Sequence, residues 1–392
     1  MRKVYLDHSA TTPVRREVAE KMWTYLTDKW GNPSSIHGVG REAKKGIEKA
    51  REKIAALLGA EAREIVFTGG GTEADNHAII GTAAALGGRK GRHIITSSIE
   101  HHAVLDTCEY LEKDGFEVTY LPVTREGVVR IEDLKSALRK DTILVSIMHA
   151  NNEVGTIQPV EDIGRICKER GILFHIDAVQ SFGKIPVDVQ DLNVDLLSIS
   201  AHKIYGPKGI GCLYIRRGVK IDNFAHGGAQ ERGRRPGTEN VAGIVGFAKA
   251  AELAVAEMET EAARQEKLRD KLIKGLQERL EDVELNGHPG HLRLCNNVNM
   301  SFKYVEGESL LLSLDMSGVA ASSGSACSSG SLDPSHVLTA MGLPLEYALG
   351  SVRMTLGRDN TEEDVDYVLD VLPDIVKRLR NMSPFYKTQA MV

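Results

Sequence analysis

The chain has 392 residues, of which 42% are hydrophobic and 26% charged, and its formal net charge at pH 7 is −5. This length suits two or three domains, while the acidic balance argues against a nucleic-acid or anionic-membrane surface. No apolar run approaches the roughly 18 residues that span a bilayer, and we expect no targeting peptide before the strand-like start at Met1–Asp7. The five cysteines are scattered without a CxxC pair. This distribution of cysteines favours a protein of the reducing cytoplasm. It argues against a disulfide framework and against a zinc site.

Strand-like and helix-like segments alternate from about residue 60 to residue 215. We predict strands at Glu64–Thr68, His93–Ser97, Glu117–Leu121, Thr142–Met148, Leu173–Asp177, Leu196–Ser200 and Gly211–Ile215. Helical patterns fill most of the gaps, including Ala103–Asp114, Ile131–Ala137 and Pro159–Arg170. The alternation predicts an α/β fold with a mostly parallel seven-stranded sheet covered by helices. The short turn before the last of these strands favours an antiparallel direction for it.

The C-terminal part has a different pattern. From Val241 to about Leu280 the chain is rich in Ala, Glu, Lys and Arg, which predicts one or two long helices leading into a second domain. Asn296–Phe302 alternates like a strand, Ser351–Met354 is a further candidate, and Thr361 opens a helix with a capping-box pattern. We predict a large domain over residues 15–255 and a smaller α+β domain over residues 1–14 and 256–392.

Cys327 lies in the run Ser322–Ser331, in which eight of ten residues are Ser or Gly. Such a run packs poorly and turns easily, so it is typical of an exposed loop. A structural cysteine prefers apolar neighbours, and the other four cysteines lie in ordinary helix-like or strand-like patterns. The loop favours a reactive thiol at Cys327, with an inert exposed thiol as the alternative. It does not indicate what the thiol attacks.

The residues that follow the predicted strands are candidates for a site, because ligands of parallel sheets bind at the carboxyl ends of the strands. After the first strand comes Gly69-Gly70-Gly71-Thr72, leading into a helix. Glycines let backbone amides approach an anion, and a helix N-terminus adds its dipole. The run is neither a Walker A loop nor a GxGxxG motif. It indicates either a phosphate cradle or a plain glycine-rich turn.

Polar residues follow four of the other strands. His101 and His102 are adjacent, so at most one of them should face a site. Asn152 lies in a polar cluster that could equally be an ordinary loop. Asp177 comes directly after the apolar residues of a strand. It could act as a helix cap or pair with a positive group on a ligand. Lys203 is the most suggestive, because lysine is rarely buried without a partner and its amine can form a Schiff base.

An anion cradle, a carboxylate and a lysine at strand ends match what pyridoxal 5'-phosphate needs. This cofactor requires a Schiff-base lysine, an acidic partner for its pyridine nitrogen and a nest for its phosphate. A nicotinamide cofactor would need no such lysine, and its glycine fingerprint is absent from the sequence. The strand ends therefore favour pyridoxal phosphate.

The segment Ser200–Gly209, SAHKIYGPKG, resembles the pyridoxal phosphate motif of the class V aminotransferase group. Other segments, in the same chain order, resemble the cysteine desulfurases of the NifS/IscS type: Tyr5–Pro13, Gly31–Ser35, His175–Gln180, Arg235–Thr238 and Ser322–Cys327. The resemblance spans nearly the whole chain, and the Ser-rich loop marks the group I branch. The chain departs from the family at Gly69-Gly70-Gly71, in place of a more usual Ser-Gly-Ala, and in lacking the longer C-terminal tail with which some IscS-type members dock a scaffold protein.

The resemblance implies a fold type I homodimer that converts L-cysteine to L-alanine and transfers the sulfur to a persulfide on Cys327. Lys203 would hold the cofactor, Asp177 would pair with its pyridine nitrogen, and His101 would stack on the ring and move protons. The resemblance further implies that Gln180 bonds the ring hydroxyl and that Asn152 contacts the cofactor. Asn152 and Arg353 would hold the substrate carboxylate. The phosphate would be held by Gly71, Thr72, Ser200 and His202, with Thr238 reaching in from the partner subunit.

The resemblance also implies an iron–sulfur scaffold protein as the sulfur acceptor, with tRNA thiolation and a nitrogenase-type pathway as alternatives. No metal site is expected, except that Cys327 could ligate an iron–sulfur cluster together with a partner's cysteines. The alternative enzymes are a selenocysteine lyase and a small-substrate aminotransferase, although an aminotransferase has no use for Cys327. A non-catalytic scaffold protein is a further alternative, against which the intact set of Lys203, Asp177 and Cys327 argues.

Overall fold

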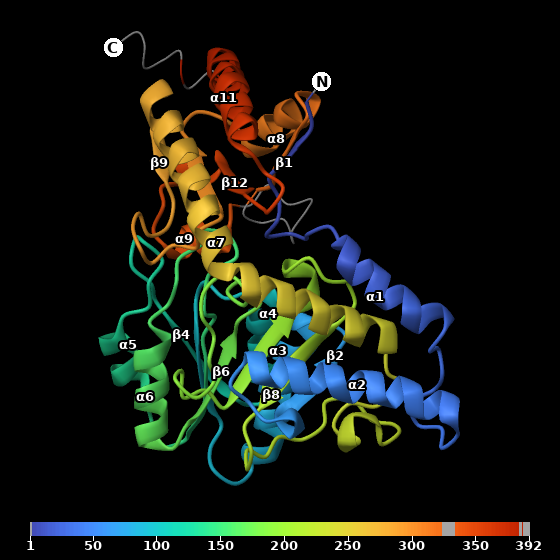
Figure 1. Cartoon of the computed structure of the whole chain (residues 1–392). Helices are drawn as coiled ribbons and strands as arrows, with labels where there is room; N and C mark the ends of the chain where they lie inside the picture. Colours follow the sequence, from blue (N-terminus) through green and yellow to red (C-terminus); the bar gives the residue numbers. More distant parts are fainter. Residues whose placement is uncertain (1, 324–333, 384–385, 387–392) are drawn as a thin grey trace.

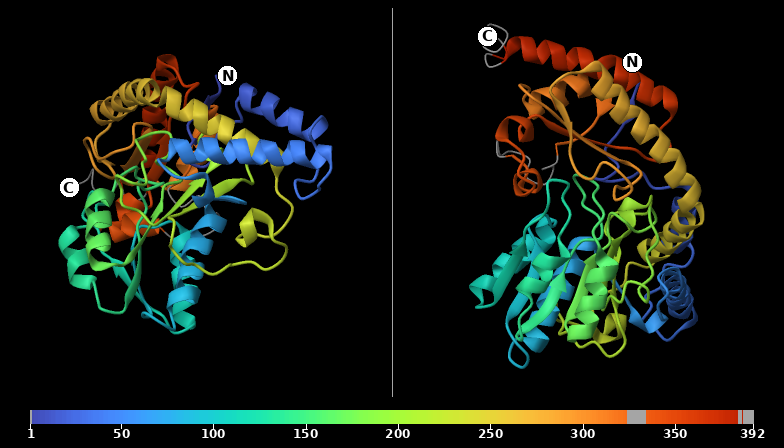
Figure 2. Two further views of the ribbon diagram at one scale, coloured as in Figure 1. Left: turned by 60° about the horizontal axis from the view of Figure 1, so that its bottom comes forward. Right: turned by 90° about the vertical axis from the view of Figure 1, so that its left-hand side faces the viewer.

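The computed structural model describes residues 2–323, 334–383 and 386. The chain forms a large body around a seven-stranded sheet and a smaller body around a three-stranded sheet. One long helix, α7 (Val241–Arg279), runs from the large body into the small one (Figure 1). It is a single helix where the sequence allowed one or two, and the predicted domain boundary at residue 255 falls inside it. Figure 2 shows the small body stacked against one end of the large one.

The large sheet has the strand order β2-β8-β7-β6-β5-β3-β4. Its strands are Ile65–Thr68 (β2), His93–Ser97 (β3), Glu117–Leu121 (β4), Thr142–Ser146 (β5), Leu173–Asp177 (β6), Leu196–Ser200 (β7) and Gly211–Ile215 (β8). Neighbouring strands are parallel except at β8, which runs antiparallel to both β7 and β2. The predicted mostly parallel seven-stranded sheet is confirmed, and so is the antiparallel strand, because the turn before β8 is too short for a parallel crossover.

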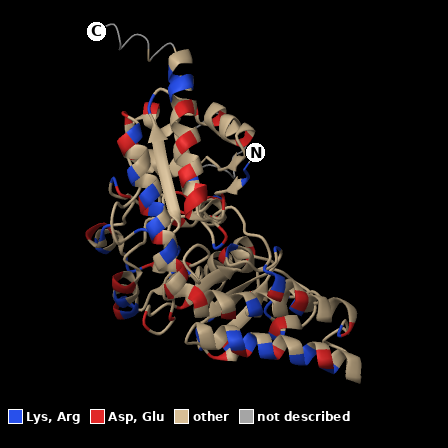
Figure 3. Cartoon of the chain, turned by 45° about the horizontal axis from the view of Figure 1, so that its top comes forward, with Lys and Arg blue, Asp and Glu red and all other residues tan. Residues whose placement is uncertain are grey.

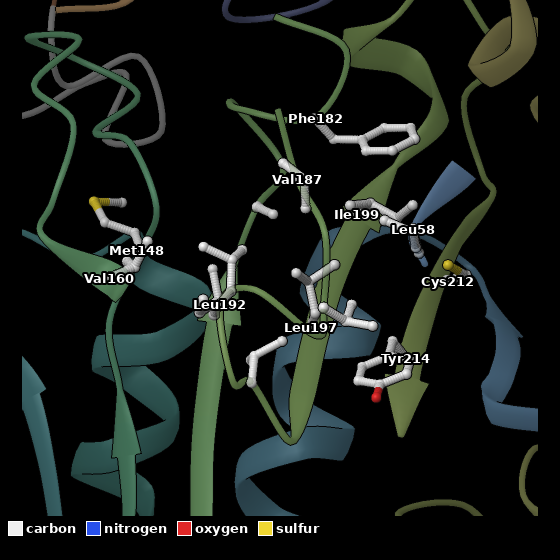
Figure 4. Close-up of a cluster of buried hydrophobic side chains, with 14 of the residues drawn as sticks. Leu58, Met148, Val160, Phe182, Val187, Leu192, Leu197, Ile199, Cys212 and Tyr214 are labelled. Atoms are coloured by element: carbon white, nitrogen blue, oxygen red, sulfur yellow. The ribbon is translucent and has the colours of Figure 1, made fainter. Parts of the chain in front are cut away.

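Helices bury both faces of this sheet. One face packs against α3 (Gly71–Leu86) and α4 (His102–Lys113), and the other against α2 (Gly38–Leu57), α6 (Val160–Arg170) and the first part of α7. On β7, Leu197 and Ile199 belong to one apolar core and Leu196 to the other, as side chains that alternate along a strand must. Figure 4 shows Leu197 beside Tyr214 of β8, while Ile199 lies nearer to Cys212, its partner in the register of β7 with β8. The remaining helices of this body are α1 (Arg16–Thr27) and α5 (Ile131–Ala137).

The small body has its own core. The strands β12 (Ser351–Thr355), β10 (Asn297–Phe302) and β9 (Val283–Leu285) form its antiparallel sheet, while β1 (Val4–Tyr5) pairs with β11 (Val319–Ala320). Its helices are α8 (Gly307–Met316) and α11 (Glu362–Met382), while the short helices α9 (His336–Ala340) and α10 (Leu345–Ala348) bury Val337, Leu338 and Ala348 in the core of the large body. The side chains of Thr361 and Asp364 form the predicted capping box at the start of α11. Val4 and Leu6 join this core, so the first residues of the chain pack with its C-terminal part.

The surface carries charges of both signs. Figure 3 shows Lys and Arg interspersed with Asp and Glu along the long helices of the visible face. Ion pairs such as Arg16–Glu20 and Lys274–Glu278, four residues apart, contribute to this mixture. Within the described part of the chain, no helix is both long and apolar enough to cross a membrane.

Candidate active site

Asp177 and Lys203 lie at the carboxyl ends of two neighbouring parallel strands. Asp177 is the last residue of β6, and in the register of β6 with β7 it stands opposite Ser198. Lys203 ends the short 3-10 turn Ala201–Lys203 that directly follows β7. The structure therefore places a carboxylate and a lysine at the ends of two adjacent strands, as the sequence predicted.

The N-terminal segment closes over these strand ends. Nζ of Lys203 donates hydrogen bonds to the carbonyl oxygens of Ser9 and Ala10, the latter at 2.7 Å. Nε2 of Gln180 donates to the same Ser9 carbonyl at 3.0 Å. Further along, the amide of Thr12 donates to the carbonyl of His202 at 3.0 Å. One carbonyl oxygen, that of Ser9, thus brings together two of the predicted site residues.

The carboxyl of Asp177 is buried, with 7% of the residue exposed. Oδ1 accepts a hydrogen bond from the amide of Val179 at 2.9 Å. Burial raises the pKa of Asp177 to about 6, while the Val179 amide and the charge of Lys203 act in the opposite direction. A positive group placed against this carboxyl would favour its ionised form.

His101 precedes α4 and caps it, whereas His102 is the first residue of that helix. Nδ1 of His101 accepts a hydrogen bond from the amide of Ala103 at 3.0 Å. Burial, and after it the charge of Lys203, lower the pKa of His101 to about 4. At neutral pH the ring is therefore uncharged and carries its proton on Nε2. His102 lies in α4, with Nδ1 at 3.1 Å from Oδ1 of Asp106.

A cavity of about 760 Å³ lies at the start of α3. The glycine-rich run lines it, together with Ser200 and His202 from the end of β7. A side chain at Gly71 would place its Cβ 2.7 Å from Cγ2 of Val179, so only glycine fits there without a shift. The amide of Gly69 donates to Oε2 of Glu73 at 2.8 Å. Backbone amides and a helix N-terminus converge here, which suits an anionic group.

Arg353 connects the small body to the large one. It is 3% exposed, and Nη1 donates to the carbonyl of Asn152 at 3.1 Å. Nη2 donates to Oδ1 of Asp7 at 3.0 Å and to Oγ of Ser322 at 2.8 Å. Among the described residues, neither Nε of Arg353 nor Oδ1 of Asn152 has a hydrogen-bond partner. These two atoms are left for a ligand with both an acceptor and a donor, such as an amino acid.

Two predicted site residues are not placed in this arrangement. Thr238 is exposed in the loop before α7 and is absent from the lining of the cavity at α3. Cys327 lies outside the described residues, so the structure carries no geometry for it. The sequence interpretation had assigned no role to Asp7, Ser9 or Ala10. Two of these act through backbone carbonyl oxygens, which give no signal in side-chain chemistry.

Comparisons with known proteins agree over the whole chain. Residues 4–368 match the family described as Aminotransferase class-V. "Cysteine desulfurase IscS" of Dictyoglomus turgidum is 61% identical over 98% of this chain and 97% of that protein. The protein of the same name from Methanosarcina thermophila is 61% identical over 97% of this chain and 94% of its own length.

Solved structures agree as well. One titled "NIFS-LIKE PROTEIN" superposes with a TM-score of 0.90 at 46% identity, covering 96% of this chain and 100% of that one. A second, titled "SspA in complex with cysteine", gives a TM-score of 0.81 at 41% identity, covering 90% of this chain and 99% of that one. The similarity therefore includes both bodies of the fold.

Proposed function

Since this chain belongs to the class V aminotransferase family, we propose that it is a pyridoxal-phosphate-dependent cysteine desulfurase that converts L-cysteine to L-alanine and collects the sulfur on Cys327. The observation that carries the proposal is that Asp177 and Lys203 stand at the ends of the neighbouring strands β6 and β7, with His101 near enough for the charge of Lys203 to lower its pKa. Relatives at 56–61% identity carry the name cysteine desulfurase. They do not favour the alternatives of a selenocysteine lyase or a small-substrate aminotransferase.

The residues present fit the cofactor. Oε1 of Gln180 is buried and has no hydrogen-bond partner in the described part of the chain, so it can accept a hydrogen bond from a ring hydroxyl. In this proposal Lys203 binds the cofactor covalently and Asp177 pairs with its ring nitrogen. The donors around the cavity at α3 would hold the phosphate: Gly71, Thr72, Ser200 and His202, joined by Thr238 of the partner subunit. When bound, pyridoxal phosphate supplies an electron sink for bond breaking at the substrate.

The chain's own residues then have separate tasks. Arg353 and Asn152 hold the substrate carboxylate and amino group in place, because a guanidinium grips a carboxylate through charge-assisted hydrogen bonds. Lys203 and the neutral His101 move protons. The thiolate of Cys327 forms a bond to the substrate sulfur as the carbon–sulfur bond breaks. The electron pair of that bond stays with carbon, which takes up a proton to give alanine, and the sulfur remains as a persulfide.

The proposal extends to partners and location. A homodimer is supported by exposed apolar side chains on one stretch of the chain, where Trp23, Trp30 and Ile36 are 65%, 68% and 91% exposed. The exposed position of Thr238 suits a contact with the other subunit. An iron–sulfur scaffold protein is proposed as the sulfur acceptor, in keeping with the names of the relatives. A cytoplasmic location is supported by the four described cysteines, which are all unpaired.

Replacing Cys327 tests the sulfur step. Cys327→Ala should abolish sulfide release from L-cysteine while leaving the absorption spectrum of the bound cofactor unchanged. Cys295→Ala is the matched control, since Cys295 is buried and unpaired. Full desulfurase turnover in Cys327→Ala would refute the persulfide mechanism. Mass spectrometry after incubation with L-cysteine should find one extra sulfur atom on the peptide that contains Cys327.

A further inference from the structure

A second, smaller cavity of about 50 Å³ lies where the large body, the small body and α7 meet. Lys203 lines it, together with His8 and Arg15 from the N-terminal segment and Asn296 from the small body. The lining of the phosphate-side cavity at α3 does not include Lys203. The small cavity therefore borders the proposed catalytic lysine on a side that does not face the cavity at α3.

Three buried polar atoms in the walls of this small cavity lack a hydrogen-bond partner among the described residues. They are Nδ1 of His8, Nε of Arg15 and Oδ1 of Asn296, in residues that are 5%, 9% and 1% exposed. Buried polar atoms are nearly always hydrogen-bonded, to protein or to ordered water. Three such atoms around one cavity indicate that something polar occupies it.

The mixture of groups favours water over an anion as the occupant, because the carboxylates of Glu257 and Glu261 line the cavity together with its lysines and arginines. Nε of Arg15 is a donor, but Oδ1 of Asn296 is an acceptor that would repel an anion. Burial lowers the pKa of His8 to about 4, so its ring is neutral and offers one donor and one acceptor nitrogen. Water satisfies both kinds of group. A volume of about 50 Å³ holds roughly three to five molecules at 10–15 Å³ each.

One residue of the cavity wall is partly exposed to solvent. This residue is Glu257, and its side chain is 39% exposed. Oε2 of Glu257 accepts a hydrogen bond from Nη1 of Arg15 at 2.6 Å, while the side chain of Arg15 is only 7% exposed. The cavity thus extends from Lys203, at the reaction centre, to an ion pair whose carboxylate is partly exposed.

We propose that this cavity holds a chain of ordered water molecules through which Lys203 exchanges protons with solvent from behind the cofactor site. His8, Arg15 and Asn296 are positioning residues that fix these waters. The proposal rests on the proposed function, because it gives Lys203 its role in proton transfer. Only protons move: Lys203 gives one proton to the nearest water, each water passes one on, and the outermost gives one to solvent. The reverse sequence recharges Lys203.

The first test is a high-resolution crystal structure of the full-length holoenzyme. We expect ordered waters within hydrogen-bonding distance of Arg15 Nε and Asn296 Oδ1. A cavity without water density would overturn the proposal, whatever the enzyme's activity.

The second test fills the cavity. Ala254 lines it from α7, so Ala254→Val inserts methyl groups without removing a polar atom. Ala256→Val is the matched control, because it places the same substitution at an exposed position of the same helix. Asn296→Leu is a second variant, which removes an acceptor as well as space. Melting temperature and cofactor absorbance establish that each variant is folded and loaded.

The readout is the loss of deuterium from α-deuterated L-alanine in ordinary water, followed by mass spectrometry. If Lys203 cannot exchange its deuterium with solvent, it returns the same deuterium to the substrate. The rate of deuterium loss should therefore fall at least about tenfold in Ala254→Val. This is smaller than the 10²–10⁴-fold effect of losing an acid–base group itself. In Ala256→Val the rate should remain that of the wild type. If a variant whose crystal structure shows a filled cavity loses deuterium at the wild-type rate, the water route is refuted while the proposed function stands. A wild-type protein that catalyses no loss of deuterium overturns the proposed function and the route with it.

Discussion

Nη2 of Arg353 donates to Oδ1 of Asp7 at 3.0 Å, across nearly the whole length of the chain. The same nitrogen donates to Oγ of Ser322, and Nη1 donates to the carbonyl of Asn152. These contacts fix the guanidinium before any ligand arrives, while Nε has no partner within the described residues. Such preorganisation lowers the entropic cost of binding a carboxylate.

Arg353→Lys should therefore weaken substrate binding more than it slows the reaction. Lysine keeps the charge but cannot reproduce the fixed fork of donors. The loss of one charge-assisted hydrogen bond, about 1.5–3 kcal/mol, corresponds to a 10- to 100-fold rise in KM for L-cysteine. Steady-state kinetics measure it, with the exposed Arg130→Lys as a control. An unchanged KM would show that Arg353 does not hold the substrate.

The inner strands of the large sheet were predictable because they are buried on both faces. Such strands appear in the sequence as short apolar runs between turn residues, and the predicted bounds of β3 and β6 coincide with the observed ones. Helices α1 and α2 were not predicted. In α2, Ala43, Ile47 and Ile54 face the core, but lysine and glutamate between them weaken the apolar pattern.

The same distinction applies to the site. Asp177 and Lys203 could be predicted because parallel strands deliver their following residues to one edge of the sheet. The contact of Lys203 with the Ser9 carbonyl could not, because it joins residues 194 positions apart through a backbone atom. The smaller cavity arises where both bodies and α7 meet, which no local pattern specifies.

Removal of one partner of the ion pair between Arg51 and Glu231 should destabilise the protein strongly. Both side chains are 3% exposed, and two hydrogen bonds of 2.7 Å connect them. Oε2 of Glu231 also accepts from the amide of Phe67 at 2.8 Å. Arg51→Leu would leave the Glu231 carboxylate buried without its cation, at a cost of about 3–5 kcal/mol in the free energy of unfolding. Urea denaturation monitored by circular dichroism measures this loss.

The exposed pair Arg16–Glu20 supplies the control for that measurement. Its side chains are 90% and 63% exposed, so Arg16→Leu should change the free energy of unfolding by less than about 1 kcal/mol. Equal losses in the two variants would contradict the assignment of a structural role to the buried pair.

His175 should make the protein less stable in acid. It is fully buried on β6, with Nδ1 at 2.8 Å from Oγ of Ser146 and Nε2 at 3.0 Å from Oγ of Ser198. Burial lowers its pKa to about 3, so between pH 6.5 and 3 only the unfolded chain binds this proton. Its contribution is complete above pH 6.5 and is lost as the pH falls toward 3, at about 1.4 kcal/mol per pH unit.

The uncharged variant His175→Gln isolates this contribution. Its free energy of unfolding should fall less steeply between pH 6 and pH 4.5 than that of the wild type. The difference in slope should be roughly that of one proton, about 1.4 kcal/mol per pH unit. Urea denaturation series at several pH values provide the comparison. Parallel pH profiles for the two proteins would mean that His175 does not remain neutral in the folded state.

Ser200→Ala tests the assignment of the phosphate cradle. Ser200 is 3% exposed and lines the cavity at the start of α3, where its hydroxyl would donate to a phosphate oxygen. Hydrogen bonds to charged groups contribute about 1.5–3 kcal/mol, so the dissociation constant of the apoprotein for pyridoxal phosphate should rise about 10- to 100-fold. Titration of the apoprotein, followed by the absorbance of the bound cofactor, measures it.

Pyridoxal, which lacks the phosphate, is the matched ligand for that titration. It occupies the ring site around Asp177 and Gln180 but has nothing to place against Ser200, so Ser200→Ala should leave its affinity unchanged. The ratio of the two affinities therefore reports the phosphate contact alone, free of any general effect of the substitution on the fold. An equal loss with both ligands would place the defect in the ring site or in the lysine, and would remove Ser200 from the cradle.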